Sequence, residues 1–336
     1  MFAALVESSI KVIVVIIALL TGCAYSTYLE RKVVAFMQNR IGPIYAGPYG
    51  LLQPIADALK LVFKEDLVPS SVERITFALA PIVSFIPALL TFAVVPFSAD
   101  NLFGLHFKGV ISDLNIGILY IFAVTSLGVY GIVLAGWSSG SKYSLMGGLR
   151  SSAQMISYEV SYGLSIMGVI LVANTLSLRE LVDMQAAHGF WFFKNWFIWK
   201  QPVAFLLYLT CAIAETNRAP FDLPEAESEL VAGYHTEYSS MRFSMFFIGE
   251  YANMIAVSAV GTTLFFGGWH GPGPAWLSLF WFAAKVFLFM FFYIWLRATF
   301  PRFRYDQLMN FGWKVLFPTA LVWTMLTAVL VVLGIF

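Results

Sequence analysis

Acidic side chains gather in one short stretch of an otherwise apolar chain. Six of the 19 acidic residues lie between positions 215 and 237, and two more, Glu159 and Glu250, interrupt long apolar runs. Lys285 interrupts another. Neighbouring carboxylates raise one another's pKa, which suits proton exchange near neutral pH. The cluster consists of Glu215, Asp222, Glu225, Glu227, Glu229 and Glu237.

Each acidic feature also has a structural interpretation. The cluster could be a solvated loop, but Pro220 and Pro224 stiffen it and apolar residues alternate with its charges. A charge at mid-bilayer costs about 2.5–3.5 kcal/mol on insertion scales, so such residues tend to face an interior path. A structural ion pair is an equally good interpretation for Glu250 and Lys285. Glu159 lies near a run's end, where its carboxylate could reach the membrane interface.

The composition requires a membrane to hold these residues. Of 336 residues, 60% are hydrophobic and 12% are charged, whereas soluble domains carry about 25% charged residues. The mean hydropathy is +0.79. We therefore predict a single all-α integral membrane domain, 1–336, with eight transmembrane helices. The expected spans are 8–29, 76–97, 116–137, 155–174, 198–214, 243–267, 276–297 and 314–335.

The distribution of basic residues predicts the orientation. Thirteen Lys and Arg residues fall in the odd-numbered loops, and five fall in the even-numbered loops or near the N-terminus. Because cytoplasmic loops carry the excess of positive charge, the odd-numbered loops are predicted to be cytoplasmic and both termini to lie outside. The net charge of +1 argues against a nucleic-acid partner.

The first cytoplasmic loop contains an amphipathic segment. Leu51, Leu52, Ile55, Leu59, Val62 and Phe63 share one helical face, and Gln53, Asp57, Lys60 and Lys64 share the other. A helix with such faces either lies on the membrane surface or lines a cavity against a soluble partner. Neither interpretation is decided by the spacing alone.

Metal and cofactor chemistry has little support in the sequence. The four histidines, at 106, 188, 235 and 270, lack metal-ligand spacing. Cys23 and Cys211 are too few for an iron–sulfur cluster and lie in apolar segments, where buried inert thiols are a better interpretation than a disulfide. We predict no metal and no cofactor bound by this chain alone. The residues alone fit a transporter, a proton channel or a redox-complex subunit equally.

Three long polar stretches carry a resemblance. They are 30–43 (ERKVVAFMQNRIGP) with 47–57 (GPYGLLQPIAD), 214–238 (AETNRAPFDLPEAESELVAGYHTEY) and 295–309 (WLRATFPRFRYDQLM). Over nearly the whole chain, the sequence resembles the H subunit of bacterial NADH:quinone oxidoreductase (complex I), the family that includes mitochondrial subunit 1. One departure is Ile44-Tyr45, where the family often has Asn and a basic residue.

The resemblance implies a function and a set of partners. It implies the membrane subunit that forms the quinone-access tunnel and couples quinone reduction to proton translocation. Quinone is then the substrate, and FMN and iron–sulfur clusters belong to partner subunits. Those partners are the soluble quinone-module subunits, with the terminal cluster, and the neighbouring small membrane subunits. The expected location is the bacterial inner membrane, with the mitochondrial inner membrane as the other option.

The resemblance also implies roles for individual residues. Leu52, Ile55 and Phe221 would contact the quinone tail, and Arg31, Arg40, Asp57 and Lys60 would line its polar part or dock the soluble arm. Glu215, Glu225, Glu227 and Glu229 would sense quinone reduction. Glu159 and Glu250 would carry the signal or a proton into the membrane.

Two alternatives follow from different features. The membrane anchor of a related ion-pumping hydrogenase or dehydrogenase shares the acidic loop but is less similar to the first stretch. A stand-alone secondary transporter would show inverted repeats with broken helices at matching positions, and no such symmetry is visible here.

Overall fold

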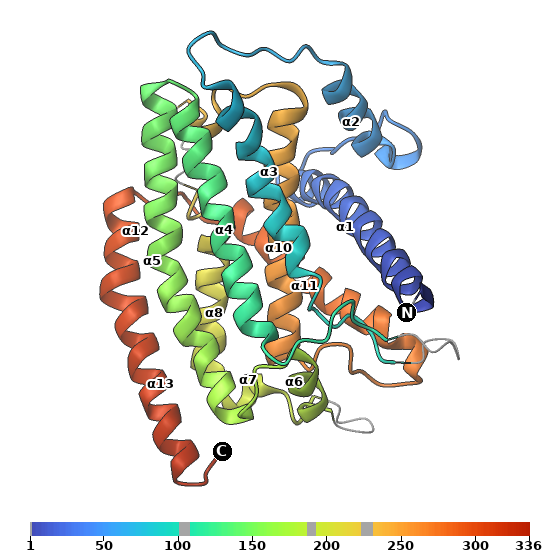
Figure 1. The fold of residues 1–336 in the computed structure, drawn as a ribbon, viewed down its shortest axis with the longest axis vertical. Helices are drawn as coiled ribbons and strands as arrows, with labels where there is room; N and C mark the ends of the chain where they lie inside the picture. The colour runs from blue at the N-terminus through green and yellow to red at the C-terminus, as the bar shows by residue number, and fades with distance from the viewer. Residues whose placement is uncertain (1, 101–107, 187–192, 223–230) are drawn as a thin grey trace.

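The chain forms a bundle of long helices in a computed structural model (Figure 1). The structure describes residues 2–100, 108–186, 193–222 and 231–336, and within these ranges it contains no β-strand. Lipid offers no hydrogen bonds to the backbone, so an apolar segment that crosses a membrane must satisfy its own N–H and C=O groups. The helix does this within one segment, which confirms the predicted all-helical class.

Seven helices of the described chain are long and apolar enough to cross a membrane. Each overlaps one of the predicted spans. The fourth is longer than predicted because it continues toward the polar loops at its N-terminal end. They are α1 (Phe2–Met37), α3 (Arg74–Thr91), α4 (Gly117–Ser138), α5 (Lys142–Ala173), α10 (Ser240–Phe265), α11 (Ser278–Thr299), and the continuous run α12 (Tyr305–Phe311), η5 (Gly312–Leu316) and α13 (Phe317–Val332).

The predicted span 198–214 has a different form. It consists of α7 (Phe197–Lys200) and α8 (Pro202–Glu215), which meet at Gln201. At 1.5 Å per residue, the 14 residues of α8 cover about 21 Å, less than the roughly 30 Å apolar core of a bilayer. Gln201 adopts a non-helical backbone and Pro202 begins the second helix, so the break is local.

The bundle has a tightly packed centre and more exposed outer helices. α5 packs between α4, α8 and α13, while α3 packs between α4 and α10. Small residues allow this: a Cβ at Gly131 of α4 would lie 2.5 Å from the Ser84 backbone nitrogen of α3. The α1 helix contacts α10 and α11 and lies at an angle to the central helices (Figure 1).

The two ends of the bundle carry different connections. One end, here called the motif end, holds η1 (Pro48–Gly50), α2 (Gln53–Phe63), residues 216–222, η3 (Gly233–His235) and residues 300–304. The opposite end holds residues 92–100, α6 (Leu178–Met184), α7 and η4 (Ala275–Leu277). Figure 1 shows α2 above the bundle and α6 and α7 below it. The three stretches that carried the resemblance thus meet at the motif end.

Candidate functional site

A largely buried network of charges joins four parts of the chain at the motif end. The Glu30 carboxylate accepts hydrogen bonds from Arg218 (Nη1 to Oε1, 3.2 Å), from Arg297, and from the Tyr251 hydroxyl (2.6 Å to Oε2). Arg218 also forms an ion pair with Glu250, with 2.6 Å between Nε and Oε1. The Arg218 guanidinium lies 4.4 Å from the centre of the Tyr251 ring.

The network ties together elements that are distant in sequence. Glu30 belongs to α1, Arg218 to the loop after α8, Glu250 and Tyr251 to α10, and Arg297 to α11. Its two carboxylates and two guanidinium groups balance in formal charge. Losing one partner from such a buried group leaves an uncompensated charge, which costs about 3–5 kcal/mol. The network therefore fixes the position of residues 216–222 against three long helices.

The same loop is also held from the α5 and α11 sides. Gln154 of α5 is fully buried, and its Nε2 donates to the carbonyl oxygens of Ala214 (3.0 Å) and Phe221 (2.9 Å). Arg302 forms an ion pair with Asp222, with 2.9 Å between Nη2 and Oδ2. The Phe303 N–H donates to Pro220 O at 3.1 Å. Residues 216–222 are therefore part of the protein interior. The interpretation of the acidic cluster as a solvated loop does not hold for this segment.

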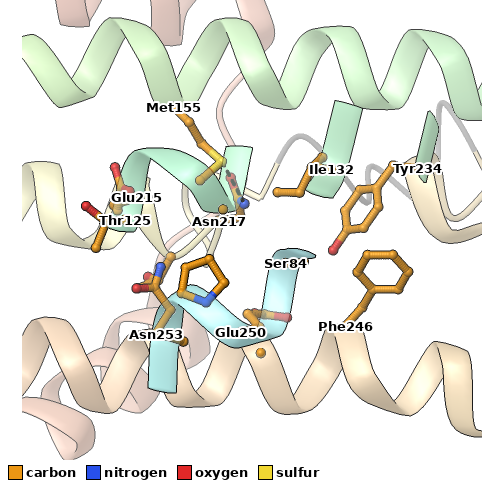
Figure 2. A pocket seen from close by; sticks show the side chains of 15 residues that line it. Ser84, Thr125, Ile132, Met155, Glu215, Asn217, Tyr234, Phe246, Glu250 and Asn253 are labelled. Atoms are coloured by element: carbon orange, nitrogen blue, oxygen red, sulfur yellow. Dashed lines mark hydrogen bonds between the residues drawn. The ribbon is translucent and has the colours of Figure 1, made fainter. Parts of the chain in front are cut away.

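A small cavity with both polar and apolar walls lies beneath this loop. Its volume is about 50 Å³, and residues of α3, α4, α5, α10 and the α8 end line it. Thr125, Glu215 and Asn253 gather at one end, whereas Tyr234 and Phe246 lie at the other (Figure 2). Because one water needs about 10–15 Å³ of such volume and several polar partners, the cavity can hold a short chain of waters.

Two carboxylates reach this cavity from different sides. Glu215, the last residue of α8, and Glu250 of α10 both line it. Glu215 is 5% exposed, and its Oε2 has no hydrogen-bond partner among the described residues. Such an atom is costly to bury unless water or a proton satisfies it. The cavity thus joins a carboxylate in need of a partner to the ion network that contains Arg218 and Glu30.

A third acidic residue lies on the neighbouring helix. Glu159 of α5 is partly buried, and it accepts a hydrogen bond from the Ser126 hydroxyl of α4. Thr125, the residue before Ser126 on α4, lines the cavity with Glu215. The acids Glu159, Glu215 and Glu250 are therefore distributed around one region of the bundle. Carboxylates inside a membrane domain, two of them facing a cavity large enough for water, are suited to proton exchange.

The first loop forms a second polar group on α2. The Arg31 guanidinium donates to Asp57 Oδ2 at 2.7 Å, and Gln53 Nε2 donates to Asp57 Oδ1 at 2.9 Å. On the other face of α2, Leu52 and Ile55 are about half exposed, as are Leu59 and Val62 further along. This apolar face is uncovered by the rest of the described chain. It is available to lipid, to a partner or to an apolar ligand.

The remaining predicted residues are placed apart. Arg40 and Lys60 are exposed, and Arg40 donates to the Gln38 side chain. Phe221 is buried between Tyr158 and Phe303, with ring centres 5.7 Å apart in each pair. The structure therefore joins Arg31 to Asp57 but packs Phe221 in a separate aromatic group. The predicted residues Glu225, Glu227 and Glu229 lie outside the described residues.

The two charged residues predicted within spans, Glu250 and Lys285, have different kinds of partner. Glu250 pairs with Arg218, in agreement with its interpretation as a structural ion pair. The Lys285 ammonium instead donates to the carbonyl oxygens of Phe266 (2.7 Å), Gly268 (2.9 Å) and His270 (2.7 Å). It therefore satisfies the backbone just beyond the end of α10, and the ion-pair interpretation of Lys285 is wrong. Cys23 and Cys211 are buried and free, as predicted.

Several central residues were missed from the sequence. Glu30 and Arg297 stand at or near the ends of apolar runs, where a charge is expected to reach water. Their positions in the first and third polar stretches were the available signal for Glu30 and Arg297. Tyr251 and Gln154 gave no such signal, because an uncharged polar residue inside an apolar helix resembles many others. Their roles depend on the way the helices pack.

Comparisons with known proteins agree on one family. A family model described as NADH dehydrogenase matches residues 10–328. An H subunit of NADH-quinone oxidoreductase from Koribacter versatilis is 54% identical and aligned over 98% of both chains. An H subunit of the same enzyme from Geobacter metallireducens is 52% identical, over 96% of this chain and 94% of its own. The corresponding protein of Protochlamydia amoebophila is 53% identical, over 92% of both.

Proposed function

The chain belongs to the NADH dehydrogenase family as a membrane subunit of NADH:quinone oxidoreductase, and from this premise we propose that its motif end admits quinone and couples quinone reduction to proton translocation. The observation that supports this most strongly is the largely buried network of Glu30, Arg218, Glu250 and Arg297. It connects the proposed quinone side of the domain to a cavity lined by Glu215.

The proposed arrangement in the membrane has eight crossings. The seven long helices supply seven, and α7 with α8 supplies the eighth, with its break at Gln201 accommodated inside the protein. The excess of Lys and Arg in loops of the motif end supports a cytoplasmic position for that end, with both termini on the periplasmic side. The location is the bacterial inner membrane. Helix α2 then lies at the cytoplasmic membrane surface.

A quinone needs two kinds of surface at this end. Its isoprenoid tail requires apolar walls, and its head requires a few polar groups. The exposed Leu52 and Ile55 of α2 offer the first, and the Arg31–Asp57 pair of the same region offers the second. Arg40 and Lys60, which are exposed, would meet the soluble arm. Phe221, which is buried, would support the loop by packing inside the protein and would not line the quinone path.

The coupling step would use the charges beneath the quinone. Quinone reduction takes up two protons, which changes the charge near Glu30 and Arg218. If the ion pair between Glu30 and Arg218 weakens, Arg218 is attracted more strongly to Glu250, with which it makes a 2.6 Å contact. Glu250 shares the cavity with Glu215, and Glu159 lies on the adjacent helix pair. Residues 216–239, with Glu225, Glu227 and Glu229, would be the element whose position and protonation respond.

The other components of the reaction belong to partner subunits. The FMN and the iron–sulfur clusters would be carried by the soluble arm, whose terminal cluster reduces the quinone. Small membrane subunits would cover the helices that continue the proton path. In this arrangement, the chain contributes only the walls of the quinone path and the carboxylates that respond first to quinone reduction.

The quinone role is tested in the assembled enzyme by placing a larger side chain on the apolar face of α2. Ile55→Trp should raise the KM for a long-tailed quinone at least fivefold, while NADH oxidation by a soluble electron acceptor stays unchanged. Ile75→Trp, at another exposed isoleucine on α3, is the matched control. If Ile55→Trp leaves both the quinone KM and the binding of a quinone-site inhibitor unchanged, the proposed path along α2 is wrong.

A further inference from the structure

A long apolar crevice runs between α1, α10 and α11, away from the cavity lined by Glu215. Its volume is about 530 Å³, and its walls extend from Val14 to Leu29 on α1 and from Leu279 to Ile294 on α11. The few polar lining atoms are already engaged: the Ser26 hydroxyl donates to Gly22 O at 2.7 Å, and that of Ser98 to Ala99 O at 3.3 Å. The crevice therefore suits hydrocarbon, and nothing proposed above uses it.

The crevice is elongated along the two helices. The 16 residues from 14 to 29 on α1, or from 279 to 294 on α11, span about 22 Å at 1.5 Å per residue. A single extended hydrocarbon chain fits along this length.

The crevice ends beneath positive charge. On α11 the lining residues recur every three or four positions up to Ile294, so the next residue of that face is Arg297. On α1 the lining face reaches Leu29, and Lys32 is the next residue in the same spacing. Arg297 has a side chain that is 41% exposed, and Lys32 is partly exposed.

The surrounding charges leave an excess of cations at this end. Glu30 and Glu250 contribute two negative charges, whereas Arg218, Arg297 and Lys32 contribute three positive ones. Arg31, the neighbouring cation on α1, is paired with Asp57. Basic residues between helix ends at the cytoplasmic surface attract anionic lipid headgroups.

From these observations we propose that the crevice binds an anionic phospholipid of the cytoplasmic leaflet. One acyl chain lies between α1 and α11, and the phosphate lies beside Lys32 and Arg297. Hydrocarbon burial holds the chain because each buried methylene group is removed from water, and the two cations select the headgroup. The site is separate from the proposed quinone path and does not depend on it.

The test uses the intact, purified enzyme complex in phosphatidylcholine nanodiscs. Trace phosphatidylglycerol that carries a photoreactive group on one acyl chain is added, and the labelled peptides are identified. Label should appear on 14–29 and 279–294. Ala283→Phe, which fills the crevice, should reduce it at least fivefold, whereas Leu288→Phe, on the exposed side of α11, should not. NADH:quinone activity, measured in parallel, reports separately on the proposed function.

The headgroup preference supplies the second arm. Lys32→Gln should lower labelling by phosphatidylglycerol about fivefold, as expected for one lysine near the surface. The exposed Lys64→Gln is the control and should have no effect. Equal labelling by phosphatidylcholine and phosphatidylglycerol probes would overturn the proposal, as would the absence of label from the crevice. Displacement of the label by a long-tailed quinone would assign the crevice to the quinone tail instead and also overturn it.

Discussion

The two ends of the helix bundle satisfy their buried polar groups in opposite ways. At the motif end, Glu30, Arg218 and Glu250 depend on one another through charged contacts between movable side chains. At the opposite end, Lys285 donates to three backbone carbonyls. There Gln185 makes four hydrogen bonds, two as donor to Leu181 O and Thr263 O and two as acceptor from backbone N–H groups.

This difference suits the two ends to different roles: the opposite end is held rigidly, whereas the motif end can respond to a change in charge. Backbone partners do not titrate, so the contacts of Lys285 and Gln185 hold the opposite end in one arrangement. Carboxylates and guanidinium groups change their balance when one charge is neutralised, because the remaining partners are left uncompensated. A proton delivered near Glu30 would therefore be felt by Arg218 and Glu250. In the function that we propose, the motif end responds to quinone chemistry and the opposite end gives it a fixed frame.

The opposite end also has an ion group outside the membrane core. Arg179 of α6 pairs with Asp100 and lies 3.6 Å from an oxygen of Asp113. The hydrogen bond to Asp100 raises the pKa of the Arg179 guanidinium above its ordinary value. The guanidinium stays charged at any physiological pH, so it ties α6 to Asp100 and Asp113 without acting as a switch.

The largest effect should follow from removing the central cation. Arg218→Gln leaves Glu30 and Glu250 with less compensation in a buried site, at a cost of about 3–5 kcal/mol. We expect NADH:quinone activity to fall more than twentyfold, together with a decrease in the amount of assembled complex on native gels. The control is Arg304→Gln, which removes an exposed pair with Asp306. Normal activity and assembly of Arg218→Gln would contradict the central role of the network.

A matched pair of glutamines sharpens the comparison of the two ends. Gln154 and Gln185 are both fully buried, and each joins separate segments through hydrogen bonds to the backbone. Replacing either by Leu leaves buried groups unpaired at about 1–3 kcal/mol each, so both variants should lose thermal stability similarly. Gln154→Leu alone should lower the proton-to-electron ratio, by about half, because Gln154 is the one of the two glutamines that bonds to residues 214–221.

The measurement for this pair is proton uptake in vesicles during NADH oxidation, with the survival of the complex after heating as the stability readout. Equal loss of coupling in Gln154→Leu and Gln185→Leu would mean that general loosening of the bundle, and not the position of residues 214–221, governs coupling.

The smallest effect is expected at the exposed pair on α2. The Arg31 side chain is 52% exposed, so its ion pair with Asp57 is screened and contributes less than about 1 kcal/mol. Arg31→Gln should leave the heat stability of the complex unchanged and raise the quinone KM about two- to threefold. A loss of stability as large as that of Arg218→Gln would show that this pair belongs to the structural network.

The sequence predicted the long helices well, and it drew attention to the acidic residues, for physical reasons that are local. Long apolar runs are helical in lipid whatever surrounds them, so each of the seven long helices overlaps a predicted span. The break at Gln201 was missed because hydropathy averages Lys200, Gln201 and Pro202 with the apolar residues around them and does not report a change in backbone direction. Glu159, Glu215 and Glu250 stood out because their charge conflicts with their surroundings.

The partners of these residues could not be predicted in the same way. Glu30 and Arg218 are 188 positions apart, and their contact depends on how α1 and the loop after α8 pack against α10. Lys285 and Glu250 looked alike as mid-span charges, yet one bonds backbone and the other pairs with arginine. The resemblance implied that Phe221 would contact the quinone tail, and only the packing of Tyr158 and Phe303 shows that it is buried.

Glu215 is the residue on which the proposed coupling depends most, since it would exchange protons in response to quinone reduction. The direct measurement is the proton-to-electron ratio of the enzyme with Glu215→Gln, reconstituted in sealed vesicles, with the exposed Glu65→Gln as the control. The amide keeps the size of the side chain and removes its ability to take up a proton. We expect quinone reduction to fall about tenfold and the remaining turnover to pump fewer protons per electron. Normal turnover with a normal ratio would contradict this role of Glu215.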